Sequence, residues 1–412
     1  MKIAIDTERI SRELETLSGF SDVASPAVTR VVFSEQDARA RAWLRGLCAE
    51  AGLEVRADAV GNTFARWRGA DENASAVATG SHIDAIPHSG RYDGTVGVLG
   101  GLEAIRALKA AGFTPRRPIE LILFTSEEPT RFGIGCLGSR LMSGVLEASV
   151  DATLKDAQGG SLSDWRGLAG FTGELGSVRL APGYYDAFVE LHIEQGPLLE
   201  RRGVPIGIVT AIAAPASLRM TIDGQGGHAG AVLMPDRHDA FLGAAEIALA
   251  LETAARSTGS IDSVATTGVC DIHPRAINSI PSRVMMEADI RDIEGARRDG
   301  MIAALERACG AVAARRGVSV ALEFINRDAP ATCDARIIDT VAGVCEAEGI
   351  AHDRMVSRAY HDSLFMARIC PATMIFIPCR NGYSHRPDEY ASPEAIALGA
   401  KVLAGTLALL AL

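Results

Sequence analysis

The 412-residue sequence lacks the features that mark membrane, secreted and nucleic-acid-binding proteins. It has no run of Lys or Arg, and a formal net charge of −10 argues against binding to a phosphate backbone. The apolar stretch in "MKIAIDTERI" is too short for a signal peptide, and "VLAGTLALLAL" is too short to span a bilayer. The eight cysteines are dispersed and contain no C-x-x-C pair. We therefore expect a cytoplasmic protein with reduced cysteines and no nucleic-acid or membrane partner.

Single hydrophobic cores stop growing near about 250–300 residues, so this chain has room for more than one domain. The first third contains two apolar runs, 76–79 and 119–124, separated by a helical pattern over 94–111. Apolar strands joined through a helix are typical of a largely parallel α/β sheet. The site of such a sheet lies at the carboxyl ends of its strands, and acidic residues follow both runs.

The pattern changes over residues 211–328. Strand-like and helical runs follow one another there in the order β-α-β-β-α-β, which is typical of a small ferredoxin-like α+β domain. Another apolar strand, 372–378, comes after this segment. We therefore predict a catalytic domain of residues 1–210 and 329–412, interrupted by an inserted domain of residues 211–328.

Side chains able to bind metal follow the ends of several predicted strands. Three imidazoles and two carboxylates suit Zn, Mn, Co or Ni better than Ca or Mg. One ion needs only three or four protein ligands, so five ligands with a carboxylate able to bridge indicate a two-metal site. The predicted ligands are His82, Asp93, Glu128, His192 and His385.

Two further acidic residues adjoin these ligands. Glu127 precedes Glu128, and on extended backbone the two side chains point in opposite directions. Glu127 is therefore the predicted general base, and later the acid that protonates the leaving nitrogen. Asp84 lies two residues from His82 and is expected to accept the second ring N–H of that histidine. The alternative is that Asp84 is a turn residue.

Six segments resemble the dinuclear metallo-amidohydrolases, which include N-carbamoyl-amino-acid hydrolases, allantoate amidohydrolases and ureidoglycolate amidohydrolases. They are "GSHIDAIPHSGRYDG", "FTSEEPTRFGIGCLGSR", "LHIEQGP", "GGHAGAVLMP", "AINSIPSR" and "GYSHRPDEY". The resemblance runs nearly end to end. The segments "EEPTRFGIGCLGSR", "HAGAVLMP" and "SRAYHDSLFMARI" look most like the ureidoglycolate branch.

The resemblance implies a role for each matching residue. Asp93 would bridge two divalent ions, with His82 and His192 on one ion and Glu128 and His385 on the other. Manganese is implied for the ureidoglycolate branch, and zinc is the other usual metal of the family. The inserted domain would act as a lid and hold a homodimer together. Roles toward the substrate fall on Gln195, His228, Asn278, Arg291, Tyr360 and His361.

The residues themselves support these substrate roles unevenly. The fork of Arg291 suits a substrate carboxylate, but a surface salt bridge with Asp289 or Asp292 is an equal alternative. His228 follows three glycines, which let the chain turn and expose the ring toward a ligand such as an oxyanion. Asn278 could serve only as a turn residue.

Tyr360 is a departure from the pattern of the carbamoylases and allantoate hydrolases. Those relatives commonly carry Gly in a motif like "AGHDA", where this chain has "AYHDS". A phenol would shrink the pocket and favour a small α-hydroxy substrate. The alternative is that Tyr360 only packs against the lid.

The predicted reaction is hydrolysis of ureidoglycolate to carbamate and hydroxyglycine, which decay to glyoxylate, ammonia and carbon dioxide. The alternative within the family is an N-carbamoyl-L-amino-acid or allantoate hydrolase. Two rivals come from other classes: a thiol amidase that uses Cys136, which no G-x-S-x-G-type elbow supports, and a non-catalytic carrier, which would be expected to lose Glu127. The histidines that match no ligand position, and are expected to be structural or solvated, are His88, His238, His273 and His352.

Overall fold

The computed structural model describes residues 2–412, which form two compact units. The sheet unit comprises residues 2–210, Cys333–Ser357 and His361–Leu412, and the inserted unit comprises Ala211–Thr332 and Arg358–Tyr360. The short return of Arg358–Tyr360 to the inserted unit lies outside the expected boundary. It has a local cause, because Arg358 pairs with Asp262 at 2.5 Å within that unit.

The sheet unit is built on a nine-stranded sheet in the order β15-β8-β17-β7-β4-β6-β3-β2, with β16 on β8. The four central strands, β17, β7, β4 and β6, run parallel to one another. The outer pairs with β3, β2, β8 and β15 are antiparallel, so the sheet is mixed rather than largely parallel as predicted. The strands are β2 (Glu54–Ala57), β3 (Thr63–Trp67), β4 (Ala76–Ser81), β6 (Ile119–Leu123), β7 (Tyr185–Ile193), β8 (Ile206–Ile212), β15 (Ala331–Thr332), β16 (His352–Ser357) and β17 (Ala372–Ile377).

Alternate residues of the central strands face opposite sides of this sheet, as the pleat requires. On one side α3 (Thr95–Ala110) lies so close that a Cβ at Gly97 would come within 2.4 Å of the Leu191 carbonyl oxygen. On the other side Ile122 and Phe188 join a buried cluster with Leu141 and Met366, which come from short helices. The sheet is therefore buried on both faces, and its carboxyl ends remain for function.

The helices of the sheet unit fall into a long and a short set. The long helices are α1 (Thr7–Ser18), α2 (Glu35–Glu50), α3, α10 (Ala335–Ala347) and α12 (Pro393–Leu410). The short helices are α4 (Leu137–Ser143), α5 (Val150–Thr153), α6 (Leu162–Leu168), η1 (Leu175–Val178), α7 (Leu198–Arg202), α11 (Asp362–Met366) and η3 (Arg380–Gly382). A small antiparallel pair, β1 (Val28–Arg30) and β5 (Ala85–Ser89), completes the unit.

One helix, α12, is long and apolar enough to cross a membrane by length and composition. It packs against α3, α10 and α1, and 56% of its apolar window is buried inside the protein. These contacts are those of a core helix, in agreement with the buried terminal helix expected from the sequence.

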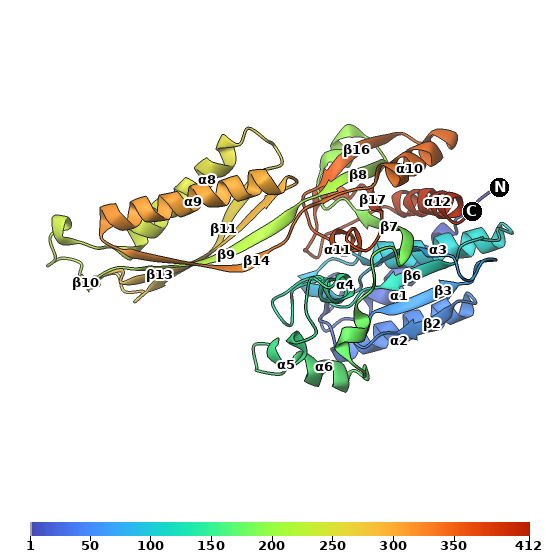
Figure 1. The fold of residues 1–412 in the computed structure, drawn as a ribbon, viewed down its shortest axis with the longest axis horizontal. Coiled ribbons are helices and arrows are strands. Elements are labelled where there is room, and N and C mark those ends of the chain that lie inside the picture. Colours follow the sequence, from blue (N-terminus) through green and yellow to red (C-terminus); the bar gives the residue numbers. More distant parts are fainter. Residues whose placement is uncertain (1) are drawn as a thin grey trace. The chain divides into compact units, whose positions relative to one another are not determined.

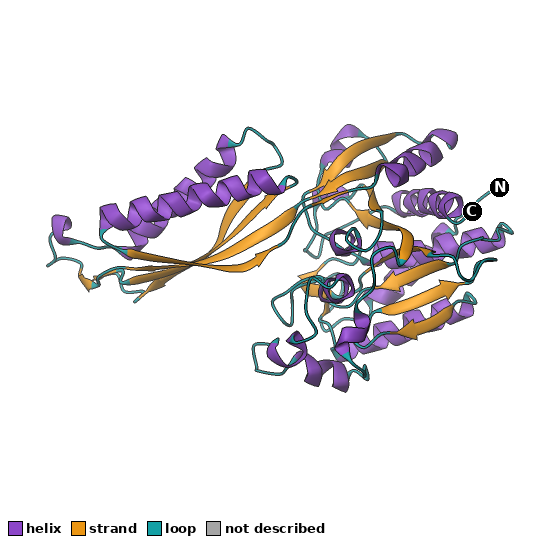
Figure 2. Ribbon diagram, in the orientation of Figure 1, coloured by secondary structure: helices purple, strands orange, loops and turns teal. Residues whose placement is uncertain are grey.

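The inserted unit is a four-stranded antiparallel sheet in the order β11-β13-β9-β14. Two long helices, α8 (Ala240–Ser257) and α9 (Gly295–Arg316), lie together on one side of it (Figures 1 and 2). Every second residue of β13 is buried, which matches a sheet covered on one face. The strands are β9 (Ala214–Asp223), β11 (Val264–His273), β13 (Arg283–Asp292) and β14 (Ser319–Arg327), with a small pair β10 (Gly227–His228) and β12 (Ser279–Ile280) and the turn η2 (Met234–Asp236).

Candidate functional site

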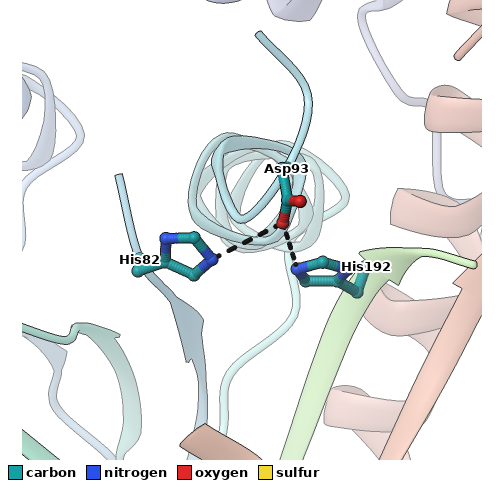
Figure 3. Close-up of side chains that lie close together, drawn as sticks. All are labelled: His82, Asp93 and His192. Atoms are coloured by element: carbon teal, nitrogen blue, oxygen red, sulfur yellow. Dashed lines mark ion pairs between the residues drawn. The ribbon is translucent and has the colours of Figure 1, made fainter. Parts of the chain in front are cut away.

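All five predicted ligands meet beyond the carboxyl ends of the central strands. Ligand atoms of His82, Asp93 and His192 lie within 4.8 Å of one another, and Figure 3 shows the two rings facing one oxygen of Asp93. A second group, Asp93, Glu128 and His385, satisfies the same limit. Asp93 belongs to both groups, so the two candidate metal positions share one carboxylate.

The two oxygens of Asp93 face different partners. Its Oδ1 lies 3.7 Å from His82 Nε2 and 3.2 Å from His192 Nε2. Its Oδ2 lies 3.3 Å from His385 Nε2, and the same nitrogen lies 3.3 Å from Glu128 Oε1. One oxygen toward each group is the arrangement of a carboxylate able to bridge two ions.

Backbone carbonyls orient two of the imidazole rings. His82 Nδ1 lies 3.0 Å from the Asp84 carbonyl oxygen, and His192 Nδ1 lies 2.9 Å from the Ile193 carbonyl oxygen. A carbonyl can only accept, so each contact places the ring proton on Nδ1 and leaves the Nε2 lone pair toward Asp93. Both rings are therefore held in the tautomer that a metal ligand needs.

The expected contact between Asp84 and the second ring nitrogen of His82 is made by the backbone carbonyl of Asp84 and not by its carboxylate. The carboxylate oxygen lies 3.7 Å from His82 Nδ1, beyond hydrogen-bond reach. It accepts instead from the backbone N–H groups of Glu127 at 3.2 Å and Glu128 at 3.0 Å. Asp84 is fully buried, and a buried carboxylate takes the donors that the loop after β6 presents to it. Asp84 thus positions the two glutamates through its carboxylate and His82 through its backbone carbonyl.

The loop that carries the glutamates is also fixed from its other side. The N–H groups of Cys136 and Leu137 donate to the carbonyls of Glu127 at 2.8 Å and Ser126 at 2.9 Å. Ser126, directly before the two glutamates, has a φ of +56° in the left-handed region. The loop therefore holds its geometry through backbone hydrogen bonds on both sides.

Glu127 and Glu128 nevertheless diverge, as predicted. Glu127 Oε2 lies 3.7 Å from His82 Nε2, whereas Glu128 faces His385. Burial raises the pKa of Glu127 well above its usual range, and the neighbouring Glu128 raises it further despite the opposing effect of His82. Burial and Asp93 raise the pKa of Glu128 to about 7. A buried carboxyl with a raised pKa is suited to both accepting and returning a proton.

Two substrate-contact candidates belong to this centre. Gln195 Nε2 donates to Asp93 Oδ2 at 2.6 Å, and Gln195 Oε1 is buried without a hydrogen-bond partner among residues 2–412. His361 lies with its ring centroid 4.6 Å from that of His192, and its Nε2 is 3.1 Å from Ser357 Oγ. Both side chains are placed where they could contact a molecule bound at the cluster.

The other four candidates lie in the inserted unit. His228 is exposed, and its Nδ1 accepts the N–H of Gly230 at 3.1 Å. The backbone of Asn278 is close to it in the fold, since the Ala229 N–H donates to the Asn278 carbonyl at 2.9 Å. Arg291 forms the ion pair with Asp289 at 2.6 Å that the sequence left open. The guanidinium carbon of Arg291 lies 5.8 Å from the centroid of the Tyr360 ring.

Cys136 does not have the environment of a nucleophile. Its Sγ lies 3.6 Å from Glu127 Oε1, and the thiol is fully buried. Burial and the adjacent Glu127 raise the pKa of this thiol well above its ordinary value, which disfavours the reactive thiolate.

The sequence reasoning missed Glu389 and Ser384. Glu389 is buried and accepts the backbone N–H groups of Tyr92 and Asp93. Glu389 and Ser384 both lie in the segment "GYSHRPDE", which also contains His385. Their closeness in sequence to this predicted ligand was the only signal of a role at the site. Their contact with Asp93 spans more than 290 residues of chain, so no local pattern announces it.

Comparisons of sequence and of structure both find related hydrolases. Residues 78–409 match peptidase family M20/M25/M40. The chain is 52% identical to a ureidoglycolate hydrolase of Arabidopsis thaliana, over 100% of this chain and 88% of the relative. It is 37% identical to an N-carbamoyl-L-amino acid amidohydrolase of Geobacillus stearothermophilus, over 98% of each chain. The crystal structure of AtUAH in complex with (S)-hydroxyglycine has a TM-score of 0.90 at 52% identity, and covers 99% of this chain and 98% of that one.

Proposed function

Because the chain belongs to peptidase family M20/M25/M40, we propose that it is an amidohydrolase that cleaves the ureido C–N bond of ureidoglycolate. The observation that carries the substrate is the 52% identity to a plant ureidoglycolate hydrolase along the whole chain. The products would be glyoxylate, ammonia and carbon dioxide.

Two divalent cations fit the residues at the centre. His82 and His192 would hold one, Glu128 and His385 the other, and Asp93 would bridge them; the convergence of three imidazoles and two carboxylates, all buried except His385, supports this. Manganese is our first choice and zinc the second. When bound, such ions supply Lewis-acid polarisation of the substrate carbonyl and lower the pKa of a water molecule.

Glu127 then moves the proton. Its carboxylate takes a proton from the attacking water as the new C–O bond forms at the ureido carbon. It returns that proton to the departing nitrogen as the C–N bond breaks, which leaves carbamate and hydroxyglycine. Carbamate decays to ammonia and carbon dioxide, and hydroxyglycine loses a second ammonia to give glyoxylate. The binding of (S)-hydroxyglycine to AtUAH supports this order of events.

The inserted unit supplies the remaining contacts in this proposal. His228 would stabilise the oxyanion, with Asn278, Arg291 and Tyr360 as substrate contacts alongside Gln195 and His361 of the sheet unit. We further propose that the inserted unit is a lid and the interface of a homodimer, and that the enzyme is cytoplasmic. The guanidinium of Arg291 and the amide of Asn278 suit the substrate carboxylate and ureido group.

A second candidate function is N-carbamoyl-L-amino-acid hydrolysis, which the 37% identity to the Geobacillus enzyme favours. The bulk of Tyr360 argues for the smaller substrate. The deciding experiment compares glyoxylate release from ureidoglycolate with amino-acid release from N-carbamoyl-L-amino acids and with allantoate hydrolysis, using Mn²⁺-loaded protein. Preference for a carbamoyl amino acid or for allantoate would overturn the proposed substrate, and no hydrolysis of any of the three would overturn the proposed activity.

A further inference from the structure

Glu389 is a buried carboxylate that no step of the proposed reaction uses. Its side chain contacts the main chain at Asp93, where its Oε1 accepts the backbone N–H groups of Tyr92 at 2.7 Å and Asp93 at 3.0 Å. A Cβ in place of the hydrogen of Gly90 would lie 2.4 Å from the same oxygen, so the chain is closed around this carboxylate. Glu389 therefore fixes the main chain of the residue that joins the two candidate metal positions.

Ser384 connects the same carboxylate to the Asp93 side chain. Its Oγ lies 2.5 Å from Asp93 Oδ2 and 2.9 Å from Glu389 Oε2. Glu389 thus contacts the main chain of Asp93 with one oxygen, and its other oxygen shares the single proton of the Ser384 hydroxyl with the Asp93 carboxylate. These contacts restrain both the position of Asp93 and the rotation of its carboxylate.

Rotation matters at Asp93 more than at any other ligand of the cluster. Asp93 belongs both to the ligand group that contains His82 and to the group that contains His385, and it presents one oxygen to each. A carboxylate that turned away would leave one group with two ligands instead of three. Hydrogen-bonding partners behind metal ligands typically change metal affinity by about 10–100-fold when they are removed.

We propose that Glu389 and Ser384 are positioning residues that hold Asp93 in its bridging orientation and so determine the affinity of the two-ion site. The inference rests on the proposed two-metal function. Neither residue touches the substrate or the reacting atoms in this account. Their effect is on how tightly and in what arrangement the cations are held.

The test is a Mn²⁺ titration of the full-length Glu389→Gln protein against a competing fluorescent chelator. The amide keeps the volume of the side chain, but it removes the negative charge and replaces the oxygen that faces the Ser384 hydroxyl with an NH2 group that cannot accept, so we expect metal affinity to fall by about 10–100-fold. Electron paramagnetic resonance at two equivalents of Mn²⁺ should show less of the exchange-coupled pair and more isolated ions. The matched control is Asp388→Asn, the same chemical change on an exposed neighbour that pairs with Arg386 and has no contact with Asp93 in the described residues.

Wild-type affinity and an unchanged pair signal in Glu389→Gln would overturn the inference alone. Fewer than two ions on the wild-type protein would overturn the two-metal assignment and the inference with it. If Glu389→Gln fails to fold, as judged by the circular dichroism and melting of the metal-free protein, Ser384 decides the question. Ser384→Ala should weaken Mn²⁺ binding, and Ser384→Thr, which keeps the hydroxyl, should restore it; equal affinity in both would refute the proposal.

Discussion

At the scale of single residues, neighbouring carboxylates differ through their surroundings. Glu127 and Glu128 are adjacent in sequence, and their backbone N–H groups both donate to Asp84. The Glu127 side chain nevertheless faces His82, and that of Glu128 faces His385. Two groups of one chemical type can therefore take different roles, one as a ligand and one as a proton carrier.

The role of Glu127 predicts the behaviour of Glu127→Gln. The amide cannot accept the proton of water, so we expect kcat to fall by at least about 10²–10⁴-fold, the usual contribution of a general base. Metal content should stay near that of the wild type, because Glu127 is not one of the five ligands. Steady-state kinetics and metal analysis of the purified variant check both points, with exposed Glu346→Gln as the control. A variant with near-normal turnover would assign the base to another residue.

Individual residues also mark how far the sequence can predict the site. The expected ligands converge because His82, Glu128, His192 and His385 lie at or after the carboxyl ends of the four parallel strands, and Asp93 directly precedes α3. The hydrogen-bond donors to the Asp84 carboxylate could not be predicted, because they are backbone N–H groups of a loop that is distant in sequence. Glu389 was missed for the same reason, because a charged residue on a loop carries no pattern that signals burial.

At the scale of elements, the predicted helix over 94–111 is α3, Thr95–Ala110, and the run 119–124 is β6, Ile119–Leu123. Periodicity and capping identify such elements because burial of one face has a local signature. The direction of strand pairing has no such signature. β2 and β3 are joined by a short connection and pair antiparallel, which is why the sheet is mixed rather than largely parallel.

The junction between Asp93 and α3 gives a prediction at this scale. Gly94 has a φ of +66°, and a Cβ there would lie 2.4 Å from His82 Nε2. Gly94→Ala should therefore lose about 1–2 kcal/mol of stability from the left-handed backbone and should also bind Mn²⁺ much more weakly. Urea unfolding and the chelator competition assay measure the two effects.

The matched control for this change is Gly112→Ala. Gly112 has a similar φ of +74°, but a Cβ there meets nothing within 4 Å. It should lose a comparable amount of stability while keeping wild-type metal affinity. Equal metal affinity in the two variants would contradict the view that Gly94 is required to clear the His82 ring.

At the scale of the whole molecule, the residues proposed to act in catalysis come from both units. Glu127 belongs to the sheet unit and His228 to the inserted unit. In a homodimer held together by the inserted units, a residue of one chain can reach the site of its neighbour across the two-fold axis. We therefore propose that His228 completes the oxyanion site of the partner chain.

Mixed dimers test this assignment. We expect Glu127→Ala and His228→Ala homodimers to be nearly inactive. Unfolding and refolding the two variants together should restore activity, because one site of each mixed dimer then combines an intact Glu127 with an intact His228 from the other chain. A verified mixed dimer without activity would show that His228 acts within its own chain.

The central claim is that a pair of ions held through Asp93 is needed for hydrolysis. The most direct measurement is glyoxylate production from ureidoglycolate as Mn²⁺ is added stepwise to metal-free protein, with bound metal counted in the same samples. Two ligand groups that share one carboxylate predict that activity appears as the second ion binds and saturates near two ions per chain. Full activity at one bound ion, or in the absence of metal, would contradict the account.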